Sequence, residues 1–212
     1  MSFKLARVQR ELSVAELSPG QFTARLEQLV RVYAAAMRPA PGLLAGRRSI
    51  MTGHAANPGF RALAVAGDAG EPVGFGYGFH GAPGQWWHDT VARALAAARG
   101  AAAAATWLDD SFEIAELHVM PEYQGRGIGG NLLLRLASGR PERTALLSTR
   151  DADTPARRLY RGAGFTDLLT GFAFVPGDEP PYAVMGAVLP LRSRPPRPGH
   201  RPGPDRWPRP SR

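Results

Sequence analysis

The sequence predicts a mixed α/β or α+β fold whose central unit is a strand, a glycine-rich turn and a helix. The chain has 212 residues, of which 44% are hydrophobic, and this is enough for one core of domain size. Segments with strand and helix periodicity follow in the order strand, two helices, three strands, helix, strand, helix, two strands. An apolar run at 114–119 leads into the glycine turn at 124–130, and a helix-like run at 131–137 follows. This arrangement indicates a crossover connection within an α+β domain.

The first half of the chain is expected to hold a strand over 3–9, helices over about 20–37 and 43–55, and strands over 60–66 and 72–79. The helix over 20–37 has apolar residues at helical spacing and should end before Pro39. The two later strands flank Gly67-Asp68-Ala69-Gly70. Residues of these types favour a hairpin turn.

The second half is expected to hold a strand over 112–120, a helix over 130–138, a strand over 145–149, a helix over 154–161 and strands over 172–175 and 182–189. Thr154 is placed to cap its helix, and Pro155 suits the first helical turn. Residues 81–110 are unusual, because Trp86-Trp87-His88 is followed by an alanine-rich helical run.

The charge of the chain is concentrated at its end. The net charge is +8, but residues 191–212 contain seven arginines and one acid, which leaves +2 for residues 1–190. The segment 191–212 also has seven prolines and few aliphatic residues, so it is expected to be a disordered tail. A nucleic-acid partner is expected at most weakly, through this tail. Residues 1–190 are expected to form the folded domain.

The chain contains no cysteine, which excludes disulfides, thiolate metal sites and a cysteine nucleophile. No metal is expected. The first residues lack the apolar core of a signal peptide, and no apolar run approaches the length of about 18 residues needed to span a membrane. A cytoplasmic protein without a membrane partner is therefore expected.

The glycine turn predicts a site for an anion. A strand-to-helix turn is expected to contain Gly125, Gly127 and Gly129, which have no side chains. Several backbone N–H groups of this turn can therefore point at one phosphate. Gly125-x-Gly127-x-x-Gly130 also fits the dinucleotide-binding pattern, with Asp151 as the acid that would bind a ribose. Too few residues follow Asp151 for the second half of a doubly wound sheet. A P-loop would need a lysine after the last glycine, which the chain lacks.

Two separate motifs carry a family resemblance. The segment Leu117–Gly129, with Gln124, Gly127 and Gly129 at its core, resembles the acetyl-CoA signature of the GCN5-related N-acetyltransferase (GNAT) family. Residues 156–165, which include Leu159-Tyr160 and Gly164-Phe165, resemble the second conserved block of that family. The resemblance implies a mostly antiparallel central sheet, flanked by helices, with a splayed pair of parallel strands.

The resemblance also implies a function. The enzyme would move an acetyl group from acetyl-CoA to a primary amine by direct attack in a ternary complex. Tyr160 would be the general acid that protonates the leaving thiolate. The residues that would bind acetyl-CoA through their backbone are Leu117, His118, Val119, Gln124, Gly125, Arg126, Gly127, Ile128 and Gly129, with Arg126 as an added charge.

The general base and the acceptor are less constrained. Glu116 lies two residues before His118, so both should share one face of the strand, and Glu116 is the candidate base. Glu113 is expected on the other face. Residues 81–110 could cover the acceptor site or form a homodimer contact, and the helix over 43–55, with Arg47, Arg48 and His54, would form the opposite rim. The acceptor could be a small amine, an aminoglycoside, an amino acid or a peptide N-terminus.

Two other functions are alternatives: a non-catalytic acyl-CoA sensor or scaffold, and a dinucleotide-binding protein.

Overall fold

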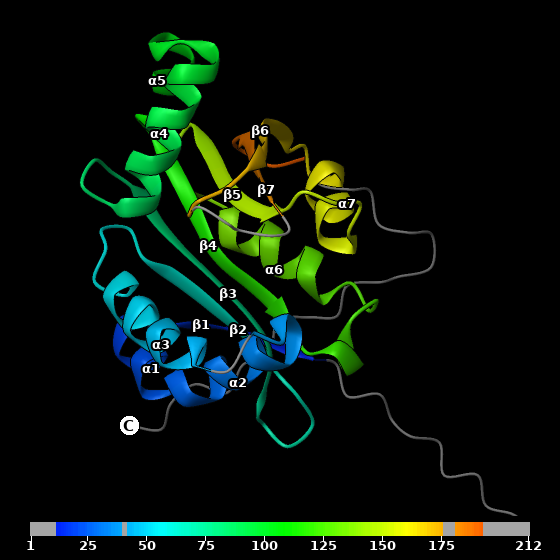
Figure 1. Ribbon diagram of the computed structural model, residues 1–212. Coiled ribbons are helices and arrows are strands. Elements are labelled where there is room, and N and C mark those ends of the chain that lie inside the picture. The colour runs from blue at the N-terminus through cyan, green and yellow to red at the C-terminus, as the bar shows by residue number, and fades with distance from the viewer. Residues whose placement is uncertain (1–11, 40–41, 176–180, 193–212) are drawn as a thin grey trace, which may run out of the picture.

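The computed structural model describes residues 12–39, 42–175 and 181–192. The strand expected over 3–9 lies outside these residues, as does all of the expected tail beyond residue 192. The described part is built around one sheet with helices on both faces (Figure 1). None of the described helices is both long enough and apolar enough to cross a membrane.

The sheet has seven strands in the order β1-β2-β3-β4-β5-β7-β6. Neighbouring strands are antiparallel except β4 and β5, which run parallel. The predicted α+β fold, with a mostly antiparallel sheet and one parallel pair, is therefore confirmed. The strands are β1 (Ser13–Leu17), β2 (Arg61–Ala66), β3 (Pro72–Gly81), β4 (Ser111–Val119), β5 (Thr144–Arg150), β6 (Thr166–Phe172) and β7 (Tyr182–Val188).

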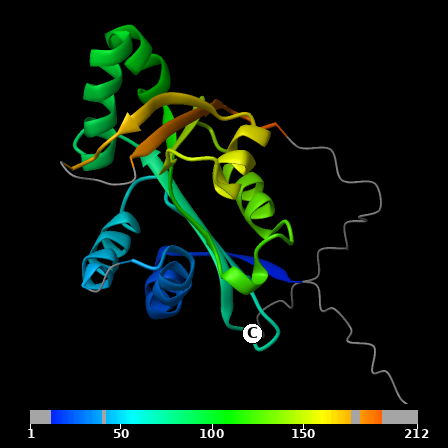
Figure 2. The ribbon, with the colours of Figure 1, turned by 45° about the vertical axis from the view of Figure 1, so that its right-hand side comes forward.

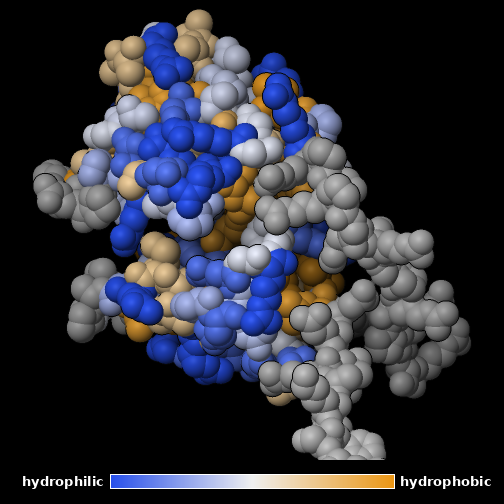
Figure 3. Space-filling view, turned by 90° about the vertical axis from the view of Figure 1, so that its right-hand side faces the viewer, coloured by the Kyte–Doolittle hydropathy of each residue, from blue (hydrophilic) through white to orange (hydrophobic). Residues whose placement is uncertain are grey.

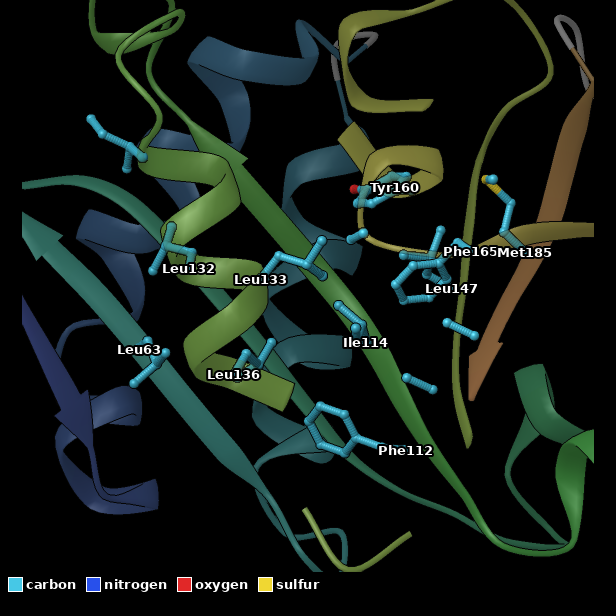
Figure 4. Packing of buried hydrophobic residues seen from close by; sticks show 14 of the residues in the cluster. Leu63, Phe112, Ile114, Leu132, Leu133, Leu136, Leu147, Tyr160, Phe165 and Met185 are labelled. Carbon is cyan, nitrogen blue, oxygen red and sulfur yellow. The ribbon is translucent and has the colours of Figure 1, made fainter. Parts of the chain in front are cut away.

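The helices cover the sheet unevenly (Figure 2). On one face, α1 to α3 pack on β2 and β3, while α4 and α5 pack on β5 to β7. On the opposite face, α6 and α7 enclose the largest core cluster, part of which Figure 4 shows. The helices are α1 (Pro19–Ala24), α2 (Leu26–Met37), α3 (Leu43–His54), α4 (Trp86–Arg99), α5 (Ala101–Leu108), the 3-10 helix η1 (Pro121–Tyr123), α6 (Ile128–Ala137) and α7 (Pro155–Gly162).

Two expected elements differ from the structure. The helix expected over 20–37 is divided at Arg25, which leaves helical geometry at ψ 5°. Ser18 starts the first part, because its side chain accepts from the Gln21 N–H while the Gln21 side chain accepts from the Ser18 N–H. The strand expected over 172–175 is wrong. The strand runs over Thr166–Phe172, where its backbone pairs with β7 in spite of a weak apolar pattern.

A β-bulge at Ala115 determines which acids share a face of β4. Glu116 lies opposite Tyr77, but the next pair joins Ile114 to Gly78, so Ala115 is the extra residue. An extra residue shifts the alternation of side chains by one. Glu113, which lies opposite Phe79, therefore points to the same face as Glu116, under α1 to α3. The expectation that Glu113 lies on the other face is wrong, because simple alternation holds only where the strand has no bulge.

Glu113 is an isolated buried acid. It is 5% exposed, and no hydrogen-bond partner for its Oε2 is found within the described ranges. Burial disfavours the charged carboxylate and raises the pKa of Glu113 to about 8.

Gly78 lies opposite the bulge, where the two strands leave no room for a side chain at position 78. A Cβ there would lie 2.3 Å from the Glu113 carbonyl oxygen and 2.6 Å from the Phe112 ring. We expect Gly78→Ala to lower the free energy of unfolding by roughly 1–3 kcal/mol or more, measured by urea denaturation. Gly53→Ala is the control, because a Cβ at this helical position has open space. It should leave stability unchanged or raise it by up to about 1 kcal/mol. Equal effects of the two substitutions would contradict the crowding at Gly78.

Glu113→Gln tests the buried acid through its pH dependence. Glu113 has a pKa near 4.5 in the unfolded chain and about 8 in the folded protein. Between these values the folded state holds one more proton, so wild-type stability falls as pH rises. The free energy of unfolding of the variant, minus that of the wild type, should therefore increase from pH 5 to 8, by up to about 1.4 kcal/mol per pH unit, and then level off.

The measurement is urea denaturation at several pH values. Glu122→Gln, which removes an exposed glutamate in η1, is the control and should follow the wild type throughout. Parallel curves for Glu113→Gln and the wild type would show that Glu113 is ionised in the folded protein at neutral pH.

Candidate active site

The site begins where β4 separates from β5. The two strands pair only from Ser111 to Glu113 on β4, and the rest of β4 pairs with β3 alone. The Met120 N–H donates to the Val73 carbonyl at 2.9 Å. In an antiparallel pair every second residue bonds to the neighbouring strand, so this bond shows which residues of β4 bond to β3 and which face away from it. By this alternation, the backbone N–H and C=O groups of Leu117 and Val119 point away from β3 and towards β5. Those of His118 point to Phe75 of β3, so His118 can offer only its side chain to the opening.

The glycine turn lies at the end of this opening. Gly125 (φ 75°) and Gly127 (φ 82°) are left-handed, and a Cβ at either position would meet nothing within 4 Å. α6 starts after Gly127, which has no side chain to cap the first N–H groups of the helix. No side chain caps these donors at the positive end of the helix. The residues fit an anionic group, because the backbone supplies the donors and the glycines keep the space clear.

The other glycines serve packing. A Cβ on Gly129 or Gly130 would come within 3.5 or 3.3 Å of the Leu159 side chain on α7. These two positions therefore let α6 and α7 approach each other closely. The glycines therefore combine an open turn, which could hold an anionic group, with a close contact between two helices.

Side chains of the turn hold its shape. The Gln124 side-chain amide donates to the Val119 carbonyl at 2.9 Å, which ties the turn to the end of β4. Arg126 donates to the Glu122 carbonyl at 2.8 Å, and its guanidinium lies 4.9 Å from the centre of the Tyr123 ring. Figure 3, which looks onto the face with α7 and the turn, shows a hollow with apolar side chains at its bottom.

Glu116 is the centre of a polar cluster on the other side of the sheet. Its Oε1 accepts from Arg47 of α3 at 2.8 Å, and its Oε2 is hydrogen-bonded to His118 Nε2. The Glu116 side chain is 8% exposed. Burial alone would raise the pKa of Glu116, but the hydrogen bond from His118 and the positive charges nearby outweigh it and lower the pKa. Glu116 is therefore an ionised carboxylate at neutral pH.

Tyr33 of α2 completes the cluster. The Arg47 guanidinium lies 4.8 Å from the centre of the Tyr33 ring, and the His118 ring lies nearly perpendicular to the same ring, 5.2 Å away between ring centres. Sequence reasoning placed Arg47 on the acceptor rim but missed its pairing with Glu116, and it missed Tyr33. No local pattern signals an ion pair between residues 69 positions apart.

Tyr160 projects from α7 at the edge of the main core (Figure 4). Thr154 caps α7 as expected, because its hydroxyl accepts from the Arg157 N–H at 3.1 Å. Tyr160 is 7% exposed and packs 5.9 Å from Phe165 between ring centres. Burial and the negative charge of Glu116 raise the pKa of Tyr160, so the phenol keeps its proton at neutral pH.

Asp151 does not have the surroundings of a ribose-binding acid. Its carboxylate pairs with Arg157, which also contacts Asp167 at 3.0 Å, and it accepts from the Gly171 N–H at 2.6 Å. These contacts hold α7 against β6. Together with the mostly antiparallel sheet, they exclude the doubly wound dinucleotide fold.

Residues 81–110 form two helices that cover the second half of the sheet. Val91, Leu95 and Leu108 pack on Leu146 and Val184 in one cluster. The Trp87 indole donates to the Ser148 hydroxyl at 3.3 Å. Beside it, Phe174 contacts the rings of Trp86, Phe172 and Tyr182. Trp86 is 62% exposed, so this aromatic group reaches the surface.

Comparison with known proteins identifies the family. Residues 60–167 match the acetyltransferase (GNAT) domain family. The chain is 35% identical over 201 residues to a GCN5-like protein acetyltransferase of Mycobacterium tuberculosis, covering 83% of this chain and 97% of the relative.

Solved structures with a similar fold include the PaiA N-acetyltransferase of Thermoplasma acidophilum in complex with coenzyme A (TM-score 0.56, 14% identity, 84% of this chain and 99% of that one). Another is a chimeric spermidine N-acetyltransferase from Vibrio cholerae (TM-score 0.54, 16% identity, 84% of this chain and 96% of that one). The family match and the curated relative agree with both sequence motifs, and they make a non-catalytic sensor the weaker reading. The chain therefore belongs to the GNAT family and is an acetyltransferase.

Proposed function

We propose that the protein transfers an acetyl group from acetyl-CoA to a primary amine by direct attack in a ternary complex. The observation that carries this proposal is the opening between β4 and β5, which ends at the uncapped, glycine-lined start of α6. The opening offers backbone groups to an extended ligand and a phosphate cradle at its end. The acyl-CoA co-substrate of the family has this combination of an extended arm and a pyrophosphate.

The donor would be bound mainly by backbone. The N–H groups of 124–129 hold the pyrophosphate. Leu117 and Val119 direct their backbone groups to the pantetheine and the thioester, and the Val119 N–H polarises the thioester carbonyl. Gln124 supports this arrangement from its side chain, because it already binds the Val119 carbonyl. Arg126 adds positive charge near the turn.

Each protein group has one role in the reaction. The amine nitrogen attacks the thioester carbonyl carbon, the carbon–sulfur bond breaks, and the sulfur leaves as a thiolate. Glu116 takes one proton from the acceptor ammonium before the attack, and Tyr160 gives its proton to the thiolate. The second proton, which the nitrogen loses when the amide forms, restores the Tyr160 phenol. Burial raises the basicity of a thiolate as well as the pKa of a phenol, so the two remain matched in the same apolar surroundings.

Glu116 is better placed for this role than Glu113. Glu113 lies within the stretch where β4 is paired on both sides, with Phe79 and Leu146 as its neighbours in register. Glu116 lies beyond the point of separation and next to Leu117, whose backbone faces the opening.

The acceptor we favour is a lysine amine of a protein. The relative from Mycobacterium tuberculosis is described as a protein acetyltransferase and is similar over almost its whole length. The exposed ring of Trp86, backed by Phe174, gives the α4 side of the molecule an apolar surface that a polypeptide can contact. A small polyamine is the competing acceptor. Acetyl transfer to a lysine-containing peptide and to spermidine, measured side by side by mass spectrometry, decides between them.

Tyr160→Phe tests the general acid. We expect kcat to fall about 100-fold or more, because the thiolate must leave without a proton donor, while the calorimetric Kd for acetyl-CoA changes little. Tyr182→Phe, which removes a phenol in the aromatic group beside α4, is the control and should retain wild-type kcat. Wild-type kcat for Tyr160→Phe would remove Tyr160 from the mechanism.

Gly127→Glu tests the cradle. The new carboxylate would fill the open space at the start of α6 and repel a pyrophosphate, so we expect calorimetric affinity for coenzyme A to fall by more than 100-fold. Gly139→Glu is a matched control, because Gly139 (φ 67°) is also left-handed and has open space, but it follows the end of α6. This control should bind coenzyme A as the wild type does. Unchanged affinity for Gly127→Glu would place the pyrophosphate elsewhere.

A further inference from the structure

Both oxygen atoms of the Glu116 carboxylate have a partner in this structure. Arg47 holds Oε1 at 2.8 Å, and His118 holds Oε2. A group that takes a proton from an amine must first come within hydrogen-bond distance of that amine. If Glu116 is the base, one of its two partners therefore has to leave when the acceptor enters.

Arg47 is the partner that can leave. His118 lies on the same strand as Glu116, and its ring is wedged between Tyr33 at 5.2 Å and Phe75 at 5.6 Å. Its side chain is 11% exposed. The Arg47 side chain is 31% exposed and extends from a different element, α3. Its long, flexible chain can turn into solvent without disturbing the core.

The place that Arg47 occupies has the chemistry of a cation site. A carboxylate binds the guanidinium from one direction, and the Tyr33 ring lies beneath it at 4.8 Å. A carboxylate combined with an aromatic face binds ammonium as well as guanidinium groups. The resting protein fills this site with one of its own side chains.

We propose that Tyr33 and Glu116 form the binding site for the ammonium group of the acceptor, and that Arg47 fills it until the acceptor displaces it. The proposal rests on the function proposed above and adds the class of ligand, a primary ammonium on an unbranched chain such as that of lysine. The exchange replaces one cation by another, so the buried carboxylate keeps a counter-charge. An uncharged acceptor would displace the Arg47 charge and put none in its place, which is costly for a buried ion.

Arg47→Gln is the central variant, and Arg48→Gln is its matched control. Arg48 is the next residue of α3, and its guanidinium pairs with Glu27 on the exposed surface, at 2.6 Å, rather than with Glu116. Initial rates are measured with Nα-acetyl-lysine amide as the acceptor and acetyl-CoA as the donor, after thermal melting has shown that both variants are folded. We expect Arg47→Gln to lower the KM for the amine about tenfold and to leave the KM for acetyl-CoA unchanged. Arg48→Gln should leave both constants unchanged.

The pH profile gives a second readout. Loss of the Arg47 charge and hydrogen bond raises the pKa of Glu116, so the acidic limb of kcat/KM should move to higher pH in Arg47→Gln and stay in place in Arg48→Gln. The groups that face Glu116 or influence its charge are His118 on β4, Arg47 and His54 on α3, Tyr33 on α2, Tyr77 on β3 and Tyr160 on α7. Arg47→Gln removes only one of these groups, so a shift of the acidic limb is attributed to Arg47.

A third measurement does not depend on turnover. In ¹⁵N-labelled wild-type protein, the Arg47 Nε–H signal, assigned by its loss in Arg47→Gln, should shift when Nα-acetyl-lysine amide is added, while the Arg48 signal stays in place. An unchanged Arg47 signal at saturating amine, or an unchanged or higher amine KM in Arg47→Gln, would overturn the proposal. If none of the proteins acetylates any amine, the proposed function fails, and the spectrum still decides whether an ammonium displaces Arg47.

Discussion

The separation of β4 from β5 is the constraint on which the rest of the site depends. A sheet normally cannot leave backbone groups unpaired in its centre without a cost. Here each of the two strands is paired on its other side, β5 with β7 and β4 with β3, where the ladder is interrupted by the bulge at Ala115. The opening therefore removes the hydrogen bonds on only one side of each strand. The Gln124 side chain replaces one of them by donating to the Val119 carbonyl. The sheet stays intact and still leaves backbone groups of β4 that a ligand could pair with.

The bulge in β4 sets the face of the sheet to which the acidic side chains near that opening point. Without it, Glu116 and Glu113 would lie on opposite faces, as the two-residue period predicts. The extra residue, Ala115, turns both acids towards the helices α1 to α3, and Gly78 on the neighbouring strand provides the room. The two acids then acquire different properties from their surroundings. Glu116 has two charged or hydrogen-bonding partners and is ionised, whereas Glu113 has apolar neighbours and holds its proton to about pH 8.

The sequence allowed the local features to be predicted and left the long-range ones open. The hairpin, the helix after the glycine turn and the Thr154 cap follow from neighbouring residues, and the structure has all three. The strand expected over 172–175 was wrong, because the pairing of β6 with β7 sets its place more than its own apolar pattern does. The pair between Arg47 and Glu116 joins distant segments, so only the packing of α3 against the sheet reveals it. The family motifs predict where the donor would bind, but they do not reach α2 and α3.

The contact between Arg47 and Glu116 has opposite effects on stability and on chemistry. The contact keeps a buried carboxylate compensated, and for the same reason it makes that carboxylate a weak base. In the proposed exchange, the ammonium balances the negative charge of Glu116 in place of Arg47, but only until it gives its proton to Glu116. Once the proton has reached Glu116, both groups are neutral, and the free amine lies beside the thioester carbonyl. The site would therefore become basic only when an acceptor is present, which protects bound acetyl-CoA from attack by water activated at an uncovered carboxylate.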